Sequence, residues 1–173
     1  MQEIYSRNTW FCLFFFPNIE LRGDNLRITS TKTLNFEWME NFIYNSALII
    51  DDSTIDNLIH KKILVNYHFV KNVHCVVSVK DGLDYLQTQF EKKADLPELI
   101  FLDIRMPDMN GFDFLKMFEQ LEPTILEKCK IYMLSSSLDP VDHERIAHYK
   151  FVKKFLGKPL TRQILDEEFT VQP

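Results

Sequence analysis

Short apolar runs alternate with amphipathic stretches five times between Tyr44 and the end of the 173-residue chain. Short, mainly apolar runs, of which 47–50 is unbroken, are typical of parallel strands that are buried on both faces. The runs are residues 47–50, 73–79, 99–102, 131–134 and 152–156. Lys153 and Lys154 interrupt the last run, which indicates an edge of the sheet. The alternation predicts an α/β fold: a doubly wound, five-stranded parallel sheet with helices on both faces and right-handed crossovers.

The intervening stretches repeat apolar residues at helical spacing, and capping residues mark where helices begin. Ser53 and Asp56 form a capping box for the first helix. Asp81 is the expected N-cap of the second helix, and Asp139 followed by Pro140 opens a fourth that runs to about residue 149. The apolar stripes of the first, second, third and fifth helices are Ile55, Leu58, Ile59 and Ile63; Leu83, Leu86 and Phe90; Phe112, Leu115, Phe118 and Leu121; and Ile164, Leu165 and Phe169.

Residues 1–38 differ from the rest of the chain. They hold both tryptophans and five of the 15 phenylalanines, but they show no sustained helical or strand period. The apolar stretch 10–17 is far shorter than the ~20 residues needed to span a bilayer, and no small-residue cleavage site follows it. We therefore expect no membrane insertion and no signal peptide. Residues 1–38 are interpreted as a leader that is disordered or wrongly assigned to the protein, with Met39 as the natural start of a folded domain, residues 39–173. The alternative is an ordered leader whose aromatic residues pack on the domain.

Composition and charge exclude several kinds of site. The chain carries 25 acidic and 20 basic residues, a formal charge of −5, so no basic field is present to gather DNA. The leader holds four residues of each sign, which leaves the whole −5 on residues 39–173. Four scattered glycines cannot form a glycine-rich phosphate loop. Three distant cysteines without C-x-x-C spacing exclude a disulfide framework and a zinc site, and they fit a reducing, cytoplasmic setting.

Polar side chains follow the predicted strands at their carboxyl ends, which is where open parallel sheets usually bind ligands. Asp51 and Asp52 follow the first strand, Asp103 the third, Ser135 the fourth and Lys158 the fifth. Clustered carboxylates repel one another and need a cation, and oxygen ligands favour Mg²⁺ or Mn²⁺ over zinc.

A carboxylate at such an edge can also act as a nucleophile. A phosphoryl group that arrives on it needs a metal ion and a second cation, here Lys158, to neutralise its oxygens. The hydroxyl of Ser135 can donate to one of those oxygens. The order of these residues along the chain therefore predicts phosphoryl transfer to an aspartate.

Four motifs together make residues 45–168 resemble a response-regulator receiver domain of the two-component signalling systems. The motifs are LIIDDS (48–53), IFLDIRMPDMNGFDFL (100–115), YMLSSS (132–137) and KFLGKPL (154–160). The resemblance implies a flavodoxin-like sheet with strand order 2-1-3-4-5. Because the chain ends directly after the fifth predicted helix, we expect a stand-alone regulator, similar to the chemotaxis regulators, without an output domain.

The resemblance also implies a role for each residue at the strand ends. Asp103 is the implied phosphoacceptor. The implied metal ligands are Asp51, Asp52, Asp103 and the backbone carbonyl of Arg105. The implied phosphoryl-binding and switch residues are Ser135, Lys158 and Phe155. The Lys158–Pro159 bond is expected to be cis. Serine at 135 and phenylalanine at 155, where threonine and tyrosine are commoner, remove no chemical function.

The expected function is that of a single-domain response regulator. A sensor histidine kinase or phosphotransfer protein donates a phosphoryl group to Asp103, and a surface change then signals to a downstream protein. The chain is expected to be a phosphoacceptor rather than an enzyme, with self-catalysed transfer and hydrolysis only. The expected output surface, for a downstream target or a second copy in a homodimer, is the face formed by the fourth helix, fifth strand and fifth helix.

Two other functions fit the same sheet less well. A metal-dependent phosphohydrolase of similar fold needs a second acid two residues after the nucleophile, where this chain has Arg105, and a substrate-binding cap. A flavin-binding electron carrier needs a hydroxyl- and glycine-rich loop after the first strand, where Asp51 and Asp52 would repel the phosphate. The five histidines share no metal-ligand spacing and are expected to be at the surface or partly buried: His60, His68, His74, His143 and His148.

Overall fold

Two compact units, Met1–Met39 and Glu40–Pro173, make up the chain in the computed structural model. The structure describes residues 19–22, 25–28, 42–136, 142, 145–146 and 148–169. In the first unit, β1 (Ile19–Arg22) and β2 (Asn25–Ile28) form an antiparallel pair. This pair was not predicted, because residues 1–38 show no sustained strand period. The other residues of the leader lie outside the described part, so their disorder stays a prediction. No helix in the described ranges combines the length and the apolar character needed to cross a membrane.

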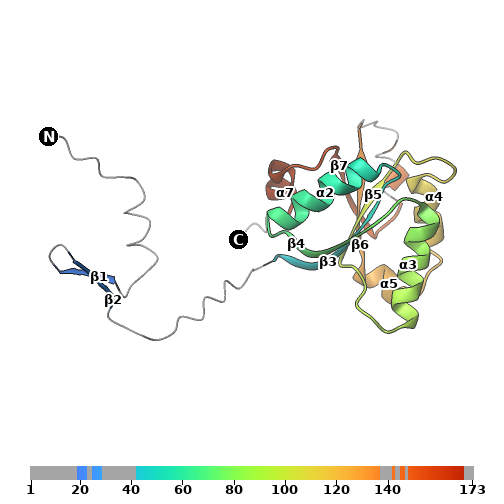
Figure 1. Ribbon diagram of the computed structural model, residues 1–173. Coiled ribbons are helices and arrows are strands. Elements are labelled where there is room, and N and C mark those ends of the chain that lie inside the picture. Colours follow the sequence, from blue (N-terminus) through green and yellow to red (C-terminus); the bar gives the residue numbers. More distant parts are fainter. Residues whose placement is uncertain are drawn as a thin grey trace. The chain divides into compact units, whose positions relative to one another are not determined.

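Five parallel strands form the centre of the second unit (Figure 1). They are β3 (Tyr44–Ile50), β4 (Val70–Val76), β5 (Leu99–Asp103), β6 (Lys130–Ser135) and β7 (Val152–Gly157). Their order across the sheet is β4-β3-β5-β6-β7, and every neighbouring pair is parallel. This confirms the predicted order 2-1-3-4-5 and places β7 at an edge.

Helices cover both faces of the sheet, as predicted (Figure 1). One face carries α2 (Thr54–Asn66) and α7 (Arg162–Phe169). The other carries α3 (Val79–Glu91), α4 (Gly111–Phe118) and a short helix that was not predicted, α5 (Pro123–Lys128). Most of the predicted fourth helix, with its proposed cap at Asp139, lies outside the described residues; residues 142, 145 and 146 are helical.

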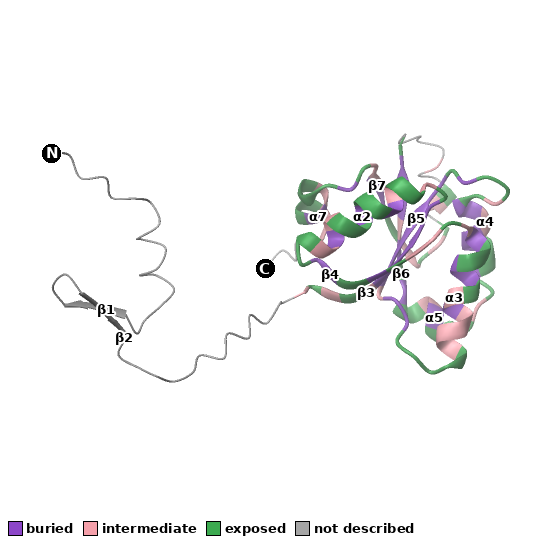
Figure 2. Ribbon diagram, viewed as in Figure 1, coloured by how far each residue is buried: buried purple, intermediate pink, exposed green. Residues whose placement is uncertain are grey.

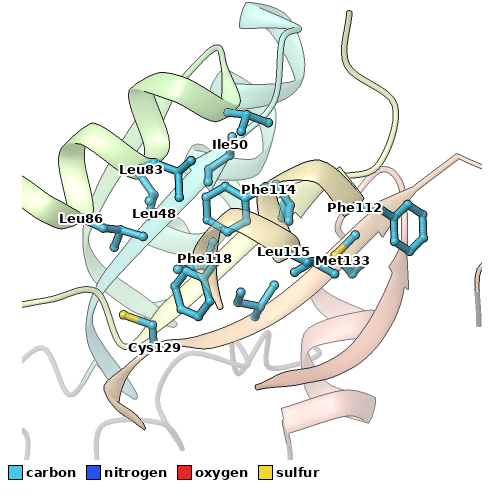
Figure 3. Close-up of a cluster of buried hydrophobic side chains, with 14 of the residues drawn as sticks. Leu48, Ile50, Leu83, Leu86, Phe112, Phe114, Leu115, Phe118, Cys129 and Met133 are labelled. Carbon is cyan, nitrogen blue, oxygen red and sulfur yellow. The ribbon is translucent and has the colours of Figure 1, made fainter. Parts of the chain in front are cut away.

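Alternate residues of each central strand pack into two apolar clusters, one on each face of the sheet. In β3, Leu48 and Ile50 join the cluster beneath α3 and α4, whereas Ala47 and Ile49 join the cluster beneath α2 and α7. Figure 2 shows the buried strands between helices whose outer sides are exposed, and Figure 3 shows side chains of α3 and α4 packed around Leu48 and Ile50. Burial on both faces explains the unbroken apolar runs in the sequence.

The start of α3 differs from the prediction. Ser78 is the N-cap, and its hydroxyl accepts a hydrogen bond from the backbone N–H of Asp81 at 3.1 Å. Asp81 therefore lies in the first turn and is not the N-cap. Because Val79 is the first helical residue and is buried, the apolar run 73–79 spans the end of β4 and the start of α3. The strand is accordingly three residues earlier than predicted.

Three of the four residues in the predicted apolar stripe of α2 do not face the sheet, which corrects the prediction for them; the fourth, Ile63, is partly buried against the cluster beneath α2 and α7. The exposed fractions of Ile55, Leu58 and Ile59 are 69%, 54% and 39%. The buried residues of α2 are Asn57, His60 and Leu64. Asn57 turns this side inward because its amide donates to the backbone carbonyl of Asp51 at 2.7 Å. We call Ile55, Leu58 and Ile59 the α2 apolar surface.

A close approach between β5 and α4 predicts an asymmetry between two glycines. A Cβ at Gly111 would lie 2.6 Å from the carbonyl oxygen of Asp103, whereas a Cβ at Gly157 would meet nothing within 4 Å. Gly111→Ala should lower the free energy of unfolding by about 1–3 kcal/mol. Gly157→Ala should stay within about 0.5 kcal/mol of wild type. Urea unfolding of the full chain measures both, and equal losses would contradict the close approach.

Candidate functional site

Strand register brings the predicted site residues to one end of the sheet. The pairing of β3 with β5 places Asp51 level with Asp103. The pairing of β5 with β6 places Ser135 one residue beyond Asp103, and that of β6 with β7 places Lys158 one residue beyond Ser135. The backbone N–H of Lys158 also donates to the carbonyl of Ser135 at 2.9 Å. Residues far apart in the sequence therefore share one edge.

Three carboxylates lie together at this edge. Asp51, Asp52 and Asp103 each offer an oxygen, and these oxygens lie within 4.8 Å of one another. Asp51 and Asp103 are buried, whereas Asp52 is exposed. The N–H of Ser53 donates to Asp51 Oδ1 at 3.0 Å, and the N–H of Arg105 donates to the Asp103 carboxylate. A set of three carboxylate oxygens fits a hard divalent cation such as Mg²⁺.

Lys158 lies among these carboxylates. Its Nζ is 2.6 Å from Asp51 Oδ2, 2.9 Å from Asp103 Oδ1 and 3.5 Å from Asp56 Oδ2. The lysine side chain is only 11% exposed. The contact with Asp56, a residue of the first turn of α2, was not predicted, since the sequence indicated only a capping role for it.

Burial and charge shift two pKa values in this cluster. Burial is the largest influence on Asp103 and raises its pKa; Lys158 lowers it in part, and the Asp51 charge raises it again. Burial alone would lower the pKa of Lys158, but Asp51 and Asp103 together outweigh burial and leave that pKa above its usual value. Lys158 is therefore protonated at neutral pH, and the site favours an additional cation.

Ser135 and Phe155 lie on the two neighbouring strands β6 and β7. Ser135 is buried at the carboxyl end of β6. Phe155 is buried in the cluster beneath α3 and α4, and its partner in the strand register is Met133. Arg105 is exposed two residues after Asp103. The switch roles of Ser135 and Phe155, and the metal-ligand role of the Arg105 carbonyl, stay predictions.

His60 is buried, so its predicted placement at or near the surface is wrong. It shares the inward side of α2 with Asn57, and burial lowers its pKa, which keeps the imidazole neutral. The charges of Asp51, Asp56 and Lys158 all act on that pKa, so His60 lies near the site. A polar Asn57 and His60 at helical spacing were the signal that the sequence offered. His68, His74 and His148 are exposed, and His143 is outside the described residues.

The bond that follows Lys158 has the expected form: the Lys158–Pro159 peptide is cis.

Comparisons of the sequence with known proteins agree on one kind of domain. A family model described as "Response regulator receiver domain" matches residues 47–170. "Two-component response regulator ORR1" of Oryza sativa subsp. japonica is 26% identical over 116 residues, which cover 66% of this chain and 49% of that protein. The chain thus spans about half the length of this relative. A protein-glutamate methylesterase/protein-glutamine glutaminase of Thermotoga maritima is 33% identical over 90 residues, 52% of this chain and 23% of that protein.

Solved structures agree with the sequence comparisons. A two-component response regulator from Cytophaga hutchinsonii has a TM-score of 0.66 and 31% identity, over 71% of this chain and 92% of that one. A response regulator receiver protein from Dyadobacter fermentans has a TM-score of 0.63 and 28% identity, over 70% and 92% of the two chains. The chemotaxis protein CheY4 of Vibrio cholerae, at 20% identity and a TM-score of 0.60 over 73% and 96%, shows the same fold.

The raised pKa of Asp103 predicts a stability effect with a defined pH dependence. The unfolded chain ionises Asp103 near pH 3.8, whereas the folded protein ionises it at higher pH. Ionisation therefore costs folding free energy, increasingly above pH 3.8 and fully once the pH exceeds the folded pKa. In metal-free buffer at pH 7, Asp103→Asn should raise the free energy of unfolding, because the neutral amide avoids the cost of a buried charge. Urea unfolding in EDTA should show this gain shrinking as the pH falls toward 4.

Asp113 provides the matched control, because a hydrogen bond from the backbone N–H of Asn110 lowers the pKa of this exposed carboxyl. Asp113→Asn should therefore lower the stability at pH 7, the opposite sign. A gain for Asp103→Asn that stays constant from pH 4 to pH 8 would contradict the electrostatic cause.

Proposed function

The chain belongs to the response regulator receiver domain family, and we propose on this premise that it accepts a phosphoryl group on Asp103 from a histidine kinase or phosphotransfer protein. One observation carries the proposal: Asp103, the Asp51–Asp52 pair and Lys158 meet at one end of the sheet. This arrangement joins a nucleophile, a divalent-cation donor set and a fixed ammonium group. Phosphoryl transfer to a carboxylate needs these three parts.

The transfer begins with an oxygen of the Asp103 carboxylate, which attacks the phosphorus of a phosphohistidine. The new P–O bond forms as the P–N bond breaks, and the imidazole leaves with the electron pair and takes up a proton. Lys158 pairs with the phosphoryl oxygens, and the Ser135 hydroxyl donates to one of them. Water later attacks the phosphorus and the bond between phosphorus and the Asp103 oxygen breaks, which releases inorganic phosphate and regenerates the carboxylate.

The metal ligands of the proposal are the carboxylates of Asp51, Asp52 and Asp103 and the backbone carbonyl of Arg105. When bound by these residues, Mg²⁺ or Mn²⁺ would supply positive charge to offset the negative charge of the transferred group. Every other contribution comes from the chain: Asp103 supplies the nucleophile, and Lys158 and Ser135 hold the phosphoryl oxygens.

Signalling in this proposal follows from contacts that exist only with the phosphoryl group in place, because a ligand with equal affinity for two conformations shifts neither. Ser135 ends β6, and the Phe155 side chain lies on the adjacent β7, so a movement at Ser135 reaches β7. The proposed output face is the one expected from the sequence: the predicted fourth helix, most of which lies outside the described residues, with β7 and α7. It would contact a downstream protein or a second copy of the chain.

We also propose a stand-alone regulator in the cytoplasm, a phosphoacceptor that turns over no external substrate. Cys75 and Cys129 are free thiols in the described part of the chain, which fits a reducing compartment.

Phosphorylation by a small donor tests the proposal. Acetyl phosphate with Mg²⁺ should label the wild-type protein, and the label should be lost on treatment with hydroxylamine, which cleaves acyl phosphates. Asp103→Asn removes the nucleophile and should lower the labelling by about 100-fold or more. Asp113→Asn, an exposed acid on α4, should label like wild type. Intact-mass spectrometry measures the labelled fraction, and undiminished label in Asp103→Asn would refute the assignment.

A protein donor must contact the surface around Asp103, and the α2 apolar surface begins there. Ile55 directly precedes Asp56, whose carboxylate is 3.5 Å from Lys158 Nζ. Single exposed apolar residues are ordinary, but three on adjacent turns form a patch of the kind that proteins bury on binding. We therefore propose that the phosphodonor protein docks on the α2 apolar surface.

Polar substitution on this surface should separate the two kinds of donor. The cognate histidine kinase is identified as the one that transfers fastest to the wild-type protein among a panel of purified kinases. Ile55→Ser combined with Leu58→Ser should slow transfer from that kinase by about ten-fold or more. Labelling by acetyl phosphate should change less than about two-fold, because that donor needs no docking surface. Met117→Ser, at an exposed apolar residue of α4, is the control. Equal losses with both donors would show that the substitutions damage the site and not the docking.

A further inference from the structure

Lys158 has three carboxylate partners, and they differ in exposure. Asp51 Oδ2 and Asp103 Oδ1, at 2.6 Å and 2.9 Å from Nζ, belong to buried side chains. Asp56 Oδ2, at 3.5 Å, belongs to a side chain that is 39% exposed. An ammonium group has three N–H donors, so these carboxylates account for all of them.

The carboxylate of Asp56 does not form the helix-capping hydrogen bond that its sequence position suggests. The backbone N–H of Asp56 donates to Ser53 Oγ at 3.2 Å, which is half of a capping box. The other half is missing, because the Ser53 N–H donates to Asp51 Oδ1 and not to Asp56. In α4, by contrast, Asn110 and Asp113 form both halves. The side chain of Asp56 is therefore directed to Lys158 and not to its own helix cap.

A divalent cation competes with Lys158 for the same carboxylates. Asp51 and Asp103 supply two of the three oxygens that lie within 4.8 Å of one another, and the same two residues bind the ammonium group. A lysine and a divalent cation a few ångströms apart repel each other strongly at a buried site. Binding of the cation must therefore weaken the contacts of Lys158 with both residues.

Among the described residues, Asp56 is the one carboxylate paired with Lys158 that lies outside the metal cluster. We propose that Asp56 is a positioning residue that takes over the Lys158 ammonium group when a divalent cation occupies the Asp51, Asp52 and Asp103 cluster. This transfer lowers the cost of metal binding and keeps Lys158 beside the phosphoryl position. The inference rests on the proposed function for the identity of the metal site.

Direct binding of Mn²⁺, measured by electron paramagnetic resonance, tests this role without phosphorylation. Asp56→Asn should weaken Mn²⁺ binding about three- to ten-fold relative to wild type. Asp56→Glu, which restores the charge, should return the affinity to within about two-fold of wild type. Asp81→Asn is the matched control, since Asp81 occupies the same position after an N-cap serine in α3, on the other face of the sheet.

Lys158 decides between a transfer of the ammonium group and a simple charge effect. In a Lys158→Ala background, Asp56→Asn should change the Mn²⁺ affinity by less than about two-fold, because no ammonium group needs a new partner. An equal loss in both backgrounds, or no loss in either, would overturn the proposal. Unfolding curves establish that the variants are folded, and Asp56→Ser is a second neutral variant.

The Mn²⁺ measurement tests the role of Asp56, and the phosphorylation measurement tests the proposed function, so the two proposals can be refuted separately. Loss of phosphorylation with the Mn²⁺ pattern intact would refute the proposed function and leave the role of Asp56 standing. Normal labelling of Asp103 with no Mn²⁺ effect of Asp56→Asn would do the reverse.

Discussion

The interaction of one ammonium group with several carboxylates is the constraint on which the rest of the site depends. Asp51 and Asp103 are buried, and Lys158 lies within 3 Å of an oxygen of each. Even so, burial keeps the pKa of Asp103 above its ordinary value, so one lysine does not fully compensate the cluster. Buried charges of one sign are tolerated only when the surrounding structure holds them in place. The apolar clusters on both faces of the sheet supply that support.

Two hydrogen bonds to backbone carbonyls hold helices against the strand ends that carry the cluster. The N–H of Gly111 donates to the carbonyl of Ile104 at 3.0 Å, which holds the start of α4 against the end of β5. On the other face, the Asn57 amide binds the carbonyl of Asp51 and holds α2 against β3. The carboxylates are thus positioned by helices whose ends are hydrogen-bonded to the strands that carry them. Carboxylates that repel one another stay close together only if the backbone that carries them is held rigidly in place.

The sheet and the main site residues could be predicted because apolar runs on the central strands end directly in Asp51 and Asp103. That signal is local, and the parallel register converts it into proximity. The orientation of α2 could not be predicted in this way, since Ile55, Leu58 and Ile59 of its apolar stripe are exposed while Asn57 and His60 are buried. The contact between Asp56 and Lys158 joins positions 102 residues apart. Nothing in the sequence near Asp56 distinguishes this contact from a helix cap, which uses the same residue types.

The net charge of the site bears on the proposed order of metal binding and phosphoryl transfer. Asp51, Asp52, Asp56 and Asp103 carry four negative charges and Lys158 one positive charge, a formal sum of −3. A phosphoryl donor is itself an anion, so the metal-free cluster repels it. In the proposed function, a divalent cation held by Asp51, Asp52 and Asp103 would change the sum to −1 and would weaken the contact between Lys158 and Asp51. The proposed order, in which metal binding precedes phosphoryl transfer, has this electrostatic reason, and Lys158 would serve both steps because the partly exposed carboxylate of Asp56 lies 3.5 Å from its ammonium group.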